Sequence, residues 1–100
     1  MSVQVFSLPS GFPREAAFFD GHFPGNPIVP GAVLLGWLSN KLSEEGLVIA
    51  RIARMKFLRP HGAAEPLEVA VTREGNSLEV EFRGAGGVVA KGLLEARLAP

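Results

Sequence analysis

The sequence contains no cysteine among its 100 residues, which excludes a disulfide framework and a catalytic thiolate. Acidic and basic residues number ten each, so the formal net charge is zero, without the basic excess that nucleic-acid surfaces show. No apolar run approaches the roughly 20 residues that cross a bilayer. The opening MSVQVFSLPSGF lacks the basic start and long apolar stretch of a secretion signal. We therefore expect a cytoplasmic protein with neither a membrane nor a nucleic-acid partner.

The length and composition fit a single domain that spans residues 1–100. Hydrophobic residues make up 47% of the chain, which is enough to build a real core. No internal repeat or low-complexity stretch divides the sequence. One domain with one core is therefore the expectation.

A short loop of unusual composition runs from Gly21 to Gly31 and reads GHFPGNPIVPG. It holds three prolines and three glycines, so it cannot continue as a regular helix. Its only ionisable side chain is His22. This composition predicts a rigid loop of specified shape, which serves either as plain architecture or as the wall of a site.

The segment after this loop, roughly Gly31 to Glu45, is predicted to be a helix. Pro30 suits the start, and Gly46 suits the left-handed residue after the end. The first half is apolar on every side, which predicts a buried helix, whereas the second half turns polar. Gly36 stands in the middle at a cost of about 1 kcal/mol relative to alanine.

The rest of the chain is predicted to form strands, apart from Pro13 to Phe19, which fits either one helical turn or an extended lead-in. The first strand covers Val3 to Leu8. Later strands cover Leu47 to Pro60, the two arms of a hairpin that turns at Glu74-Gly75-Asn76, and Gly87 to Leu98. A single, strongly apolar helix among five strands predicts an α+β fold, with an antiparallel sheet curled around one central helix.

These residues carry a resemblance to a known family. GHFPGNPIVPG resembles the signature GHFPGxPxxPG of the β-hydroxyacyl-(acyl carrier protein) dehydratases, which belong to the hot-dog superfamily. MKFLRP, residues 55–60, resembles a second family strand, and AKGLLEARL, residues 90–98, resembles the last one. The resemblance implies the hot-dog fold, in which a sheet wraps a long helix and two copies join edge to edge as a dimer.

The resemblance also implies a site without metal or cofactor. Dehydration of a 3-hydroxyacyl thioester needs a base for the C2 proton, an acid for the leaving hydroxyl and a donor for the developing oxyanion. On the family pattern His22 is the base, and the amide of Gly31, at the helix start, is the donor. The substrate-binding positions implied by the family are Phe23, Pro30, Gly31, Gly36 and Asn40.

One position departs from the family pattern. The family places its second catalytic group, a Glu or Asp, five residues after the glycine of the second Pro-Gly pair, which is Gly31 here. At that position this chain has Gly36. Ser39 and Asn40, one helical turn further along, are not strong proton donors at neutral pH. Asp20 either orients His22 or is an ordinary surface residue. Gly36 itself either widens an acyl tunnel or only permits close packing, and the following Trp37 is expected in the core.

Two functional hypotheses follow from this mixture. One is a hydro-lyase that acts on 3-hydroxyacyl thioesters of acyl carrier protein or coenzyme A in fatty-acid or related lipid and polyene synthesis, or a related thioesterase. The other is a catalytically impaired subunit that binds acyl chains or pairs with an active dehydratase. The small aryl-polyene-type dehydratases are a branch with a similar Trp after the acid position. The partners expected are therefore an acyl thioester and a second chain, in a homodimer or a heterodimer.

Two further features remain open on the sequence alone. His61 follows the second motif and is expected at a solvated strand end, with a role in the site as the alternative. Four cations follow one strand: Arg51, Arg54, Lys56 and Arg59. They form either a solvated or dimer-edge strand or a docking patch for the acidic carrier protein and its phosphate.

Overall fold

The computed structural model describes residues 1–13 and 28–100. The predictions for His22, Phe23, Asp20 and most of the segment from Pro13 to Phe19 fall on residues 14–27 and lie outside this description. The described elements follow one another in the predicted order. They are β1 (Ser2–Leu8), α1 (Gly31–Glu44), β2 (Leu47–Phe57), β3 (Leu67–Glu74), β4 (Ser77–Gly84) and β5 (Gly87–Leu98).

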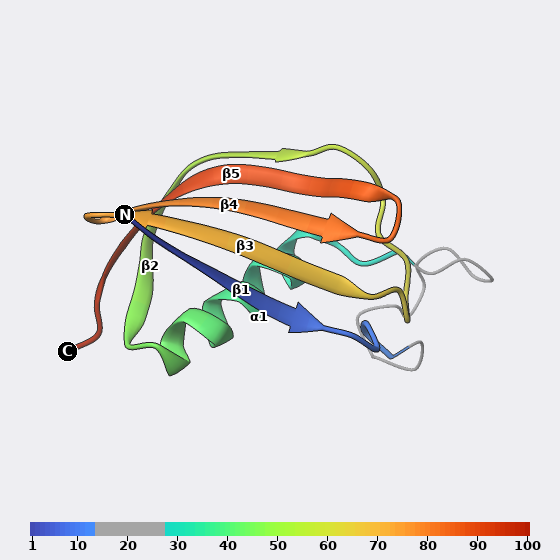
Figure 1. Ribbon diagram of the computed structural model, residues 1–100, viewed down its shortest axis with the longest axis horizontal. Helices are drawn as coiled ribbons and strands as arrows, with labels where there is room; N and C mark the ends of the chain where they lie inside the picture. Colours follow the sequence, from blue (N-terminus) through green and yellow to red (C-terminus); the bar gives the residue numbers. More distant parts are fainter. Residues whose placement is uncertain (14–27) are drawn as a thin grey trace.

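The five strands form one antiparallel sheet in the order β1-β3-β4-β5-β2. The outer strands of this sheet are therefore β1 and β2. Helix α1 passes behind β1 and β3 in Figure 1, so that one layer of sheet covers one helix. The predicted α+β class and the hot-dog arrangement are confirmed.

The core lies between the helix and the inner face of the sheet. Three leucines of α1, spaced by four residues along the helix, are buried against it: Leu34, Leu38 and Leu42. Alternate residues of the central strands complete the core, because successive side chains of a strand point to opposite faces. They are Val69, Val71, Leu78, Val80, Phe82, Leu94 and Ala96.

The prediction of a helix buried all round was wrong for the single chain. Ala32 and Gly36 are exposed, although both lie in the apolar first half of α1. The physical reason is that the chain supplies one sheet, which covers one face of the helix. Trp37 is partly buried beside the core, as expected, and its ring meets that of Phe12 edge to face, with centroids 6.5 Å apart.

The hairpin and the helix end follow from their glycines. Glu74 pairs with Ser77, so Gly75 is the first of two central turn residues, and its φ of 60° suits glycine at that place in a type II′ turn. Gly46 has a φ of 78° after the last turn of α1, and its amide donates to the Ser43 carbonyl. Both turns lie where the sequence predicted them.

Strand β2 is irregular, which explains its mixed pattern in the sequence. Its register with β5 shifts between Ile49 and Arg51 and again between Ile52 and Arg54. Each shift adds a residue on one strand and changes the face to which the following side chains point. The strand ends at Phe57 rather than Pro60, since the next residues turn away after the amide of Leu58 donates to the Val89 carbonyl at 2.8 Å.

Within residues 1–13 and 28–100, no helix has the length and apolar character needed to span a bilayer.

Candidate functional site

The start of α1 presents unused backbone donors. Pro30 is the N-cap, and its carbonyl accepts from the amides of Val33 at 2.9 Å and Leu34 at 3.3 Å. No side chain of the described residues caps the helix, and its first turn holds no acidic residue. Among the described residues, the amides of Gly31 and Ala32 have no acceptor. These two donors and the helix dipole therefore favour an oxygen that carries negative charge.

A groove of about 740 Å³ opens beside this helix start. The residues that line it come from the segment before α1, from α1 itself, from the end of β2 with the residues after it, and from β5. They are Ile28, Val29, Pro30, Gly31, Ala32, Leu34, Leu35, Phe57, Leu58, Arg59, Pro60, His61 and Val89. Because most of these side chains are apolar, the groove suits an acyl chain whose polar end reaches the free amides.

In its described position, the Phe57 ring leaves no room for a β-carbon at position 31. A β-carbon on Gly31 would lie 2.6 Å from two carbons of the Phe57 ring. This is closer than carbon atoms approach without a shift of one of them. Phe57 of MKFLRP and Gly31 of GHFPGNPIVPG, 26 residues apart in the chain, therefore meet at one wall of the groove.

The structure brings only part of the predicted site together. Pro30 and Gly31 line the groove. Gly36 and Asn40 are exposed on α1 and are not among the lining residues. Among the described residues, a β-carbon on Gly36 would have no neighbouring atom within 4 Å. His22 and Phe23 lie outside the described residues, so their roles stay predictions.

His61 was misjudged from the sequence, which placed it at a solvated strand end. It is 1% exposed, and among the described residues it is the one buried polar or charged side chain. Its Nε2 lies 3.2 Å from the carbonyl oxygen of Glu65, and its Nδ1 lies 3.5 Å from the Glu65 carboxylate. The second approach is not a hydrogen bond, because Nδ1 has no hydrogen-bond partner among the described residues. Gly84 of β4, which is distant in the sequence, packs near this ring, so the residues around His61 do not predict its burial.

The four cations of the predicted docking patch do not act as one group. Arg51 donates to Glu95 at 2.6 Å, and this bond and the opposite charge lower the pKa of the Glu95 carboxyl. Arg59 donates to the Gly86 carbonyl and lines the groove. Arg54 and Lys56 instead line a trough of about 620 Å³ across the outer face of the sheet, together with Lys91 of β5.

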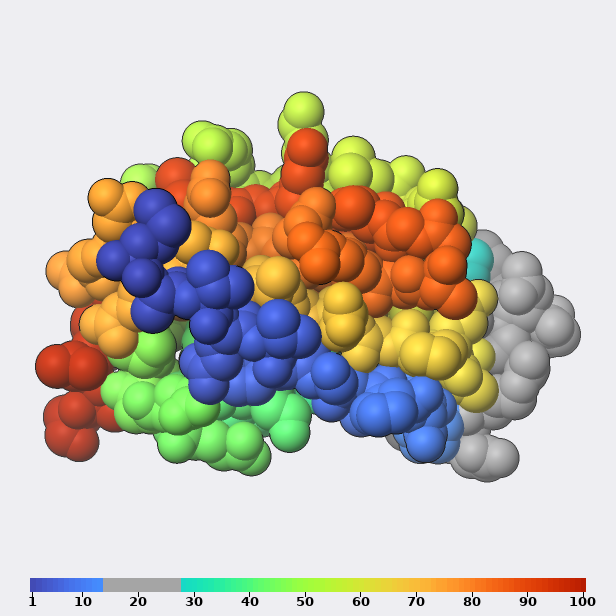
Figure 2. All heavy atoms as spheres, in the orientation of Figure 1, coloured from blue at the N-terminus to red at the C-terminus, as the bar shows by residue number. Residues whose placement is uncertain are grey.

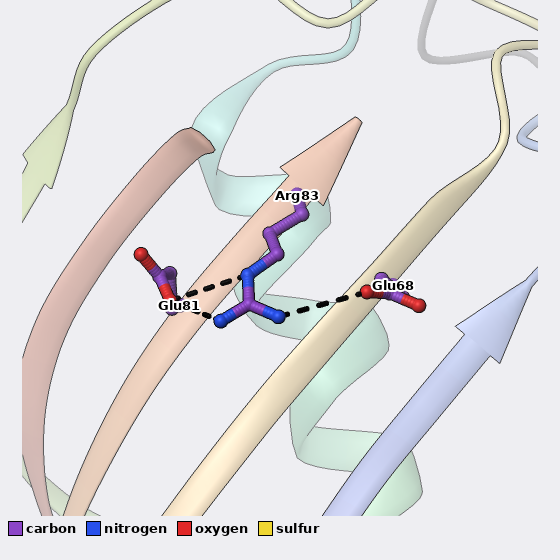
Figure 3. A network of polar contacts seen from close by, with 3 residues as sticks. All are labelled: Glu68, Glu81 and Arg83. Carbon is purple, nitrogen blue, oxygen red and sulfur yellow. Dashed lines mark hydrogen bonds and ion pairs between the residues drawn. The ribbon is translucent and has the colours of Figure 1, made fainter. Parts of the chain in front are cut away.

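The outer face of the sheet, which faces the viewer in Figure 2, carries its own ion pairs. Arg83 of β4 donates to Glu81 at 2.6 Å and lies 3.8 Å from Glu68 of β3 (Figure 3). The pKa of Arg83 is raised, first by its hydrogen bond to Glu81 and then by the negative charge of the same carboxylate. The contact with Glu68 ties β4 to β3 on the outer face of the sheet, whereas the bond to Glu81 stays within β4.

Comparison with known proteins gives a consistent result. A family model described as "ApeI-like: ApeI dehydratase" matches residues 4–92. The 3-hydroxyacyl-[acyl-carrier-protein] dehydratase FabZ of Caulobacter sp. (strain K31) is 32% identical over 96 residues, which cover 82% of this chain and 58% of that protein. FabZ of Legionella pneumophila is 33% identical over 75 residues, which cover 69% and 47%. The chain thus spans about half the length of these curated relatives.

A solved structure with the same fold is "The Dehydratase Heterocomplex ApeI:P from Xenorhabdus doucetiae". It superposes with a TM-score of 0.78 at 18% identity, over 94% of this chain and 86% of that chain. At this identity the likeness concerns the fold, which agrees with the sheet and helix described above.

Proposed function

Because this chain belongs to the ApeI-like dehydratase family, we propose that it binds 3-hydroxyacyl thioesters and takes part in their dehydration in the cytoplasm. The observation that carries this proposal is the pair of free amides at Gly31 and Ala32 beside an apolar groove. Catalysis of this type depends on donors that are already in place where negative charge develops. A thioester carbonyl at the helix start has these donors within reach, and its acyl chain has an apolar wall.

The proposed reaction breaks the C2–H and C3–O bonds, forms a C2–C3 double bond and releases water. Loss of the C2 proton places negative charge on the thioester oxygen, which the Gly31 amide is proposed to stabilise. His22 is the proposed base, on the family pattern. The proton that turns the leaving hydroxyl into water must come from an acid, and this chain has glycine at the family's acid position.

Gly36 favours a second candidate function, that of a subunit which needs an active partner. The exposed α1 residues Ala32 and Gly36 would then face another chain that brings the carboxylate. The dehydratase heterocomplex ApeI:P supports this alternative, because a chain of the same fold belongs there to a complex of unlike subunits. A homodimer of impaired activity is the remaining possibility within the same family.

Strand β2 is the proposed dimer edge in either case. It is an outer strand of the sheet, and apolar side chains at and just after it are about half exposed: Ile52 at 48%, Phe57 at 53% and Leu58 at 51%. An open strand edge with apolar side chains is a template for pairing with another chain. Since Phe57 and Leu58 also line the groove, a second chain on β2 would close one of its sides.

The test is a dehydration assay with a 3-hydroxyacyl thioester, carried in turn on acyl carrier protein, coenzyme A and N-acetylcysteamine. The purified chain is assayed alone and then mixed with an acid-bearing dehydratase of the same family. Formation of the 2-enoyl thioester in either arm that is lost on His22→Ala supports the proposal. Hydrolysis to free acid and thiol would support the thioesterase alternative instead. The absence of both turnover and binding, in both arms, would contradict the proposal.

A further inference from the structure

The segment that carries Val29 and Pro30 into α1 rests on the backbone of His61. The amide of Val29 donates to the His61 carbonyl at 2.7 Å, and Ile28 and Gly62 form an isolated antiparallel bridge beside it. Val29 is itself 5% exposed. Two residues later the chain reaches Gly31, whose amide points from the helix start. The direction of that amide therefore depends on where the His61 carbonyl lies.

The His61 ring is in turn fixed by the turn that follows it. Nε2 faces the Glu65 carbonyl at 3.2 Å, and a carbonyl oxygen only accepts. Nε2 therefore bears a hydrogen and donates it to this carbonyl. Behind the ring, β4 has glycine at residue 84. A β-carbon there would lie 3.0 Å from Nδ1.

The turn from His61 to Glu65 contains a backbone conformation that needs outside support. Ala64 has a φ of 62°, a left-handed value that is uncommon for residues other than glycine. Such conformations persist when surrounding contacts hold them. Here the Ala64 amide donates to the Phe12 carbonyl at 2.7 Å, and the His61 ring bonds the next residue, Glu65. The hydrogen bond from the His61 imidazole to the Glu65 carbonyl, called the brace below, therefore links the two ends of this turn.

We propose that His61 is a positioning residue: its imidazole, held by the Glu65 carbonyl, fixes the peptide that anchors Val29 and so aims the free amides of Gly31 and Ala32 into the groove. The value of these amides for a thioester rests on the proposed function. The mechanical link from His61 to Val29 does not. This assigns a role to the one buried polar side chain of the described residues, which lies outside the family's motifs.

Two variants of His61 separate its two nitrogens. The side-chain nitrogen of glutamine reaches the place of Nε2, and that of asparagine reaches only the place of Nδ1. His61→Gln can therefore keep the bond to the Glu65 carbonyl, whereas His61→Asn cannot. We expect hydrogen exchange at the Val29 amide to stay near the original rate in His61→Gln. In His61→Asn it should rise by about two- to tenfold, the effect of one lost hydrogen bond.

A merely structural role would lower stability without a preference between these two nitrogens. Equal exchange rates at Val29 in His61→Gln and His61→Asn would therefore overturn the proposal, and so would an unchanged rate in His61→Asn. A second signature comes from the imidazole ¹⁵N spectrum of the original protein, which should show the hydrogen on Nε2. A neutral ring protonated on Nδ1 would contradict the assignment.

If the His61 variants do not fold, a third variant tests the same proposal without changing His61 itself. Gly84→Ala places a methyl group against Nδ1 and should displace the ring, so exchange at Val29 should again be faster. Gly36→Ala is the matched control, because its methyl group meets no atom of residues 1–13 and 28–100 within 4 Å and should leave exchange at Val29 unchanged. Equal exchange in both alanine variants would count against the brace.

An acyl-N-acetylcysteamine thioester is the probe that tests whether His61 affects ligand binding at the amides of Gly31 and Ala32. Its addition should shift the amide resonances of Gly31 and Ala32 in the original protein and in His61→Gln, and shift them less in folded His61→Asn. Equal shifts in all three would overturn the positioning role. If the probe binds none of them, the proposed function fails. The exchange rates at Val29 still test whether His61 positions the Val29 peptide.

Discussion

The ring of Phe57 lies directly against Gly31, at the point where the helix begins and the groove opens. The contact joins the end of β2 to the start of α1. A larger residue at position 31 would require the ring or the helix start to shift. Phe57 is itself 53% exposed, so the ring forms an outer wall rather than a part of the core. Access to the free amides therefore passes along this side chain.

Gly31→Ala should weaken thioester binding through this contact. The new methyl group would lie 2.6 Å from the ring carbons, so the ring must swing away or the helix start must shift. Overpacking of this kind costs about 1–3 kcal/mol in a closed core and should cost less here, where the ring can move into solvent. Titration with the N-acetylcysteamine thioester measures the change. Adding Phe57→Ala to the variant should restore part of the binding, and a failure to do so would place the defect elsewhere.

The leucine row of α1 should dominate the stability of the chain. Leu38 is 0% exposed between helix and sheet, so Leu38→Ala should lower the free energy of unfolding by about 2–5 kcal/mol. Leu98→Ala is the matched control, since Leu98 is 70% exposed and its loss should change the free energy by less than about 0.5 kcal/mol. Urea unfolding followed by circular dichroism measures both. Similar losses in the two variants would contradict the described core.

The sequence was sufficient for the architecture because that architecture rests on local and periodic signals. The leucines of α1 recur every four residues, the hairpin carries its glycine at the turn, and strands β3 and β4 alternate cleanly. Each of these signals acts over a few residues, so it is visible in the sequence itself. The fold was therefore predictable in its order, its class and most of its boundaries.

The site was less predictable because its contacts are not local. The contact of Phe57 with Gly31 joins residues 26 positions apart in the chain, so no local pattern predicts it. The burial of His61 depends on Gly84 of β4, 23 residues further along. The exposure of Gly36 depends on how many sheets cover the helix, and a single chain supplies one. These properties belong to packing between distant segments.

Acid should weaken the fold through the pair of Arg51 and Glu95. The hydrogen bond from Arg51, and then its charge, lower the pKa of Glu95 from its ordinary 4.5. A carboxyl whose pKa is lowered by folding contributes stability that is complete above its unfolded pKa and is lost as the pH falls through its folded pKa. The loss should therefore appear below about pH 4.5 and should shrink in high salt, because the pair is exposed.

Glu95→Gln tests this pH dependence. Its melting temperature should approach that of the original protein as the pH falls below 4.5, and the difference between the two should open toward neutral pH. Arg51→Gln should give the same profile, and the double variant should add little to either, because the two side chains share one interaction. A difference between Glu95→Gln and the original protein that is constant from acid to neutral pH would contradict the assignment.

Gly36→Asp is the variant that bears most directly on the proposed function. In the part of the chain that the structure describes, a β-carbon at this position meets no atom within 4 Å, and the residue is exposed. The carboxylate should therefore enter without steric cost or burial in the single chain. Helix propensity favours almost any residue over glycine, by up to about 1 kcal/mol, so the melting temperature should not fall. If the missing acid limits the protein alone, the variant should dehydrate the 3-hydroxyacyl thioester faster. Positioned general acid catalysis contributes roughly 10²–10⁴-fold, so a partial recovery would be measurable.

Ser39→Asp is the control for this gain, since it adds the same charge to an exposed position one turn along α1. Only Gly36→Asp should raise the rate, and the added His22→Ala should abolish the gain, because the acid and the base act on the same substrate. A stable Gly36→Asp protein without any gain would mean that the proton comes from a group at another place, on this chain or on a partner. Robust activity of the unchanged protein alone, lost on His22→Ala, would show that the family's pair of catalytic residues does not apply here. In that case Asp20 or a bound water would be the next acid to test.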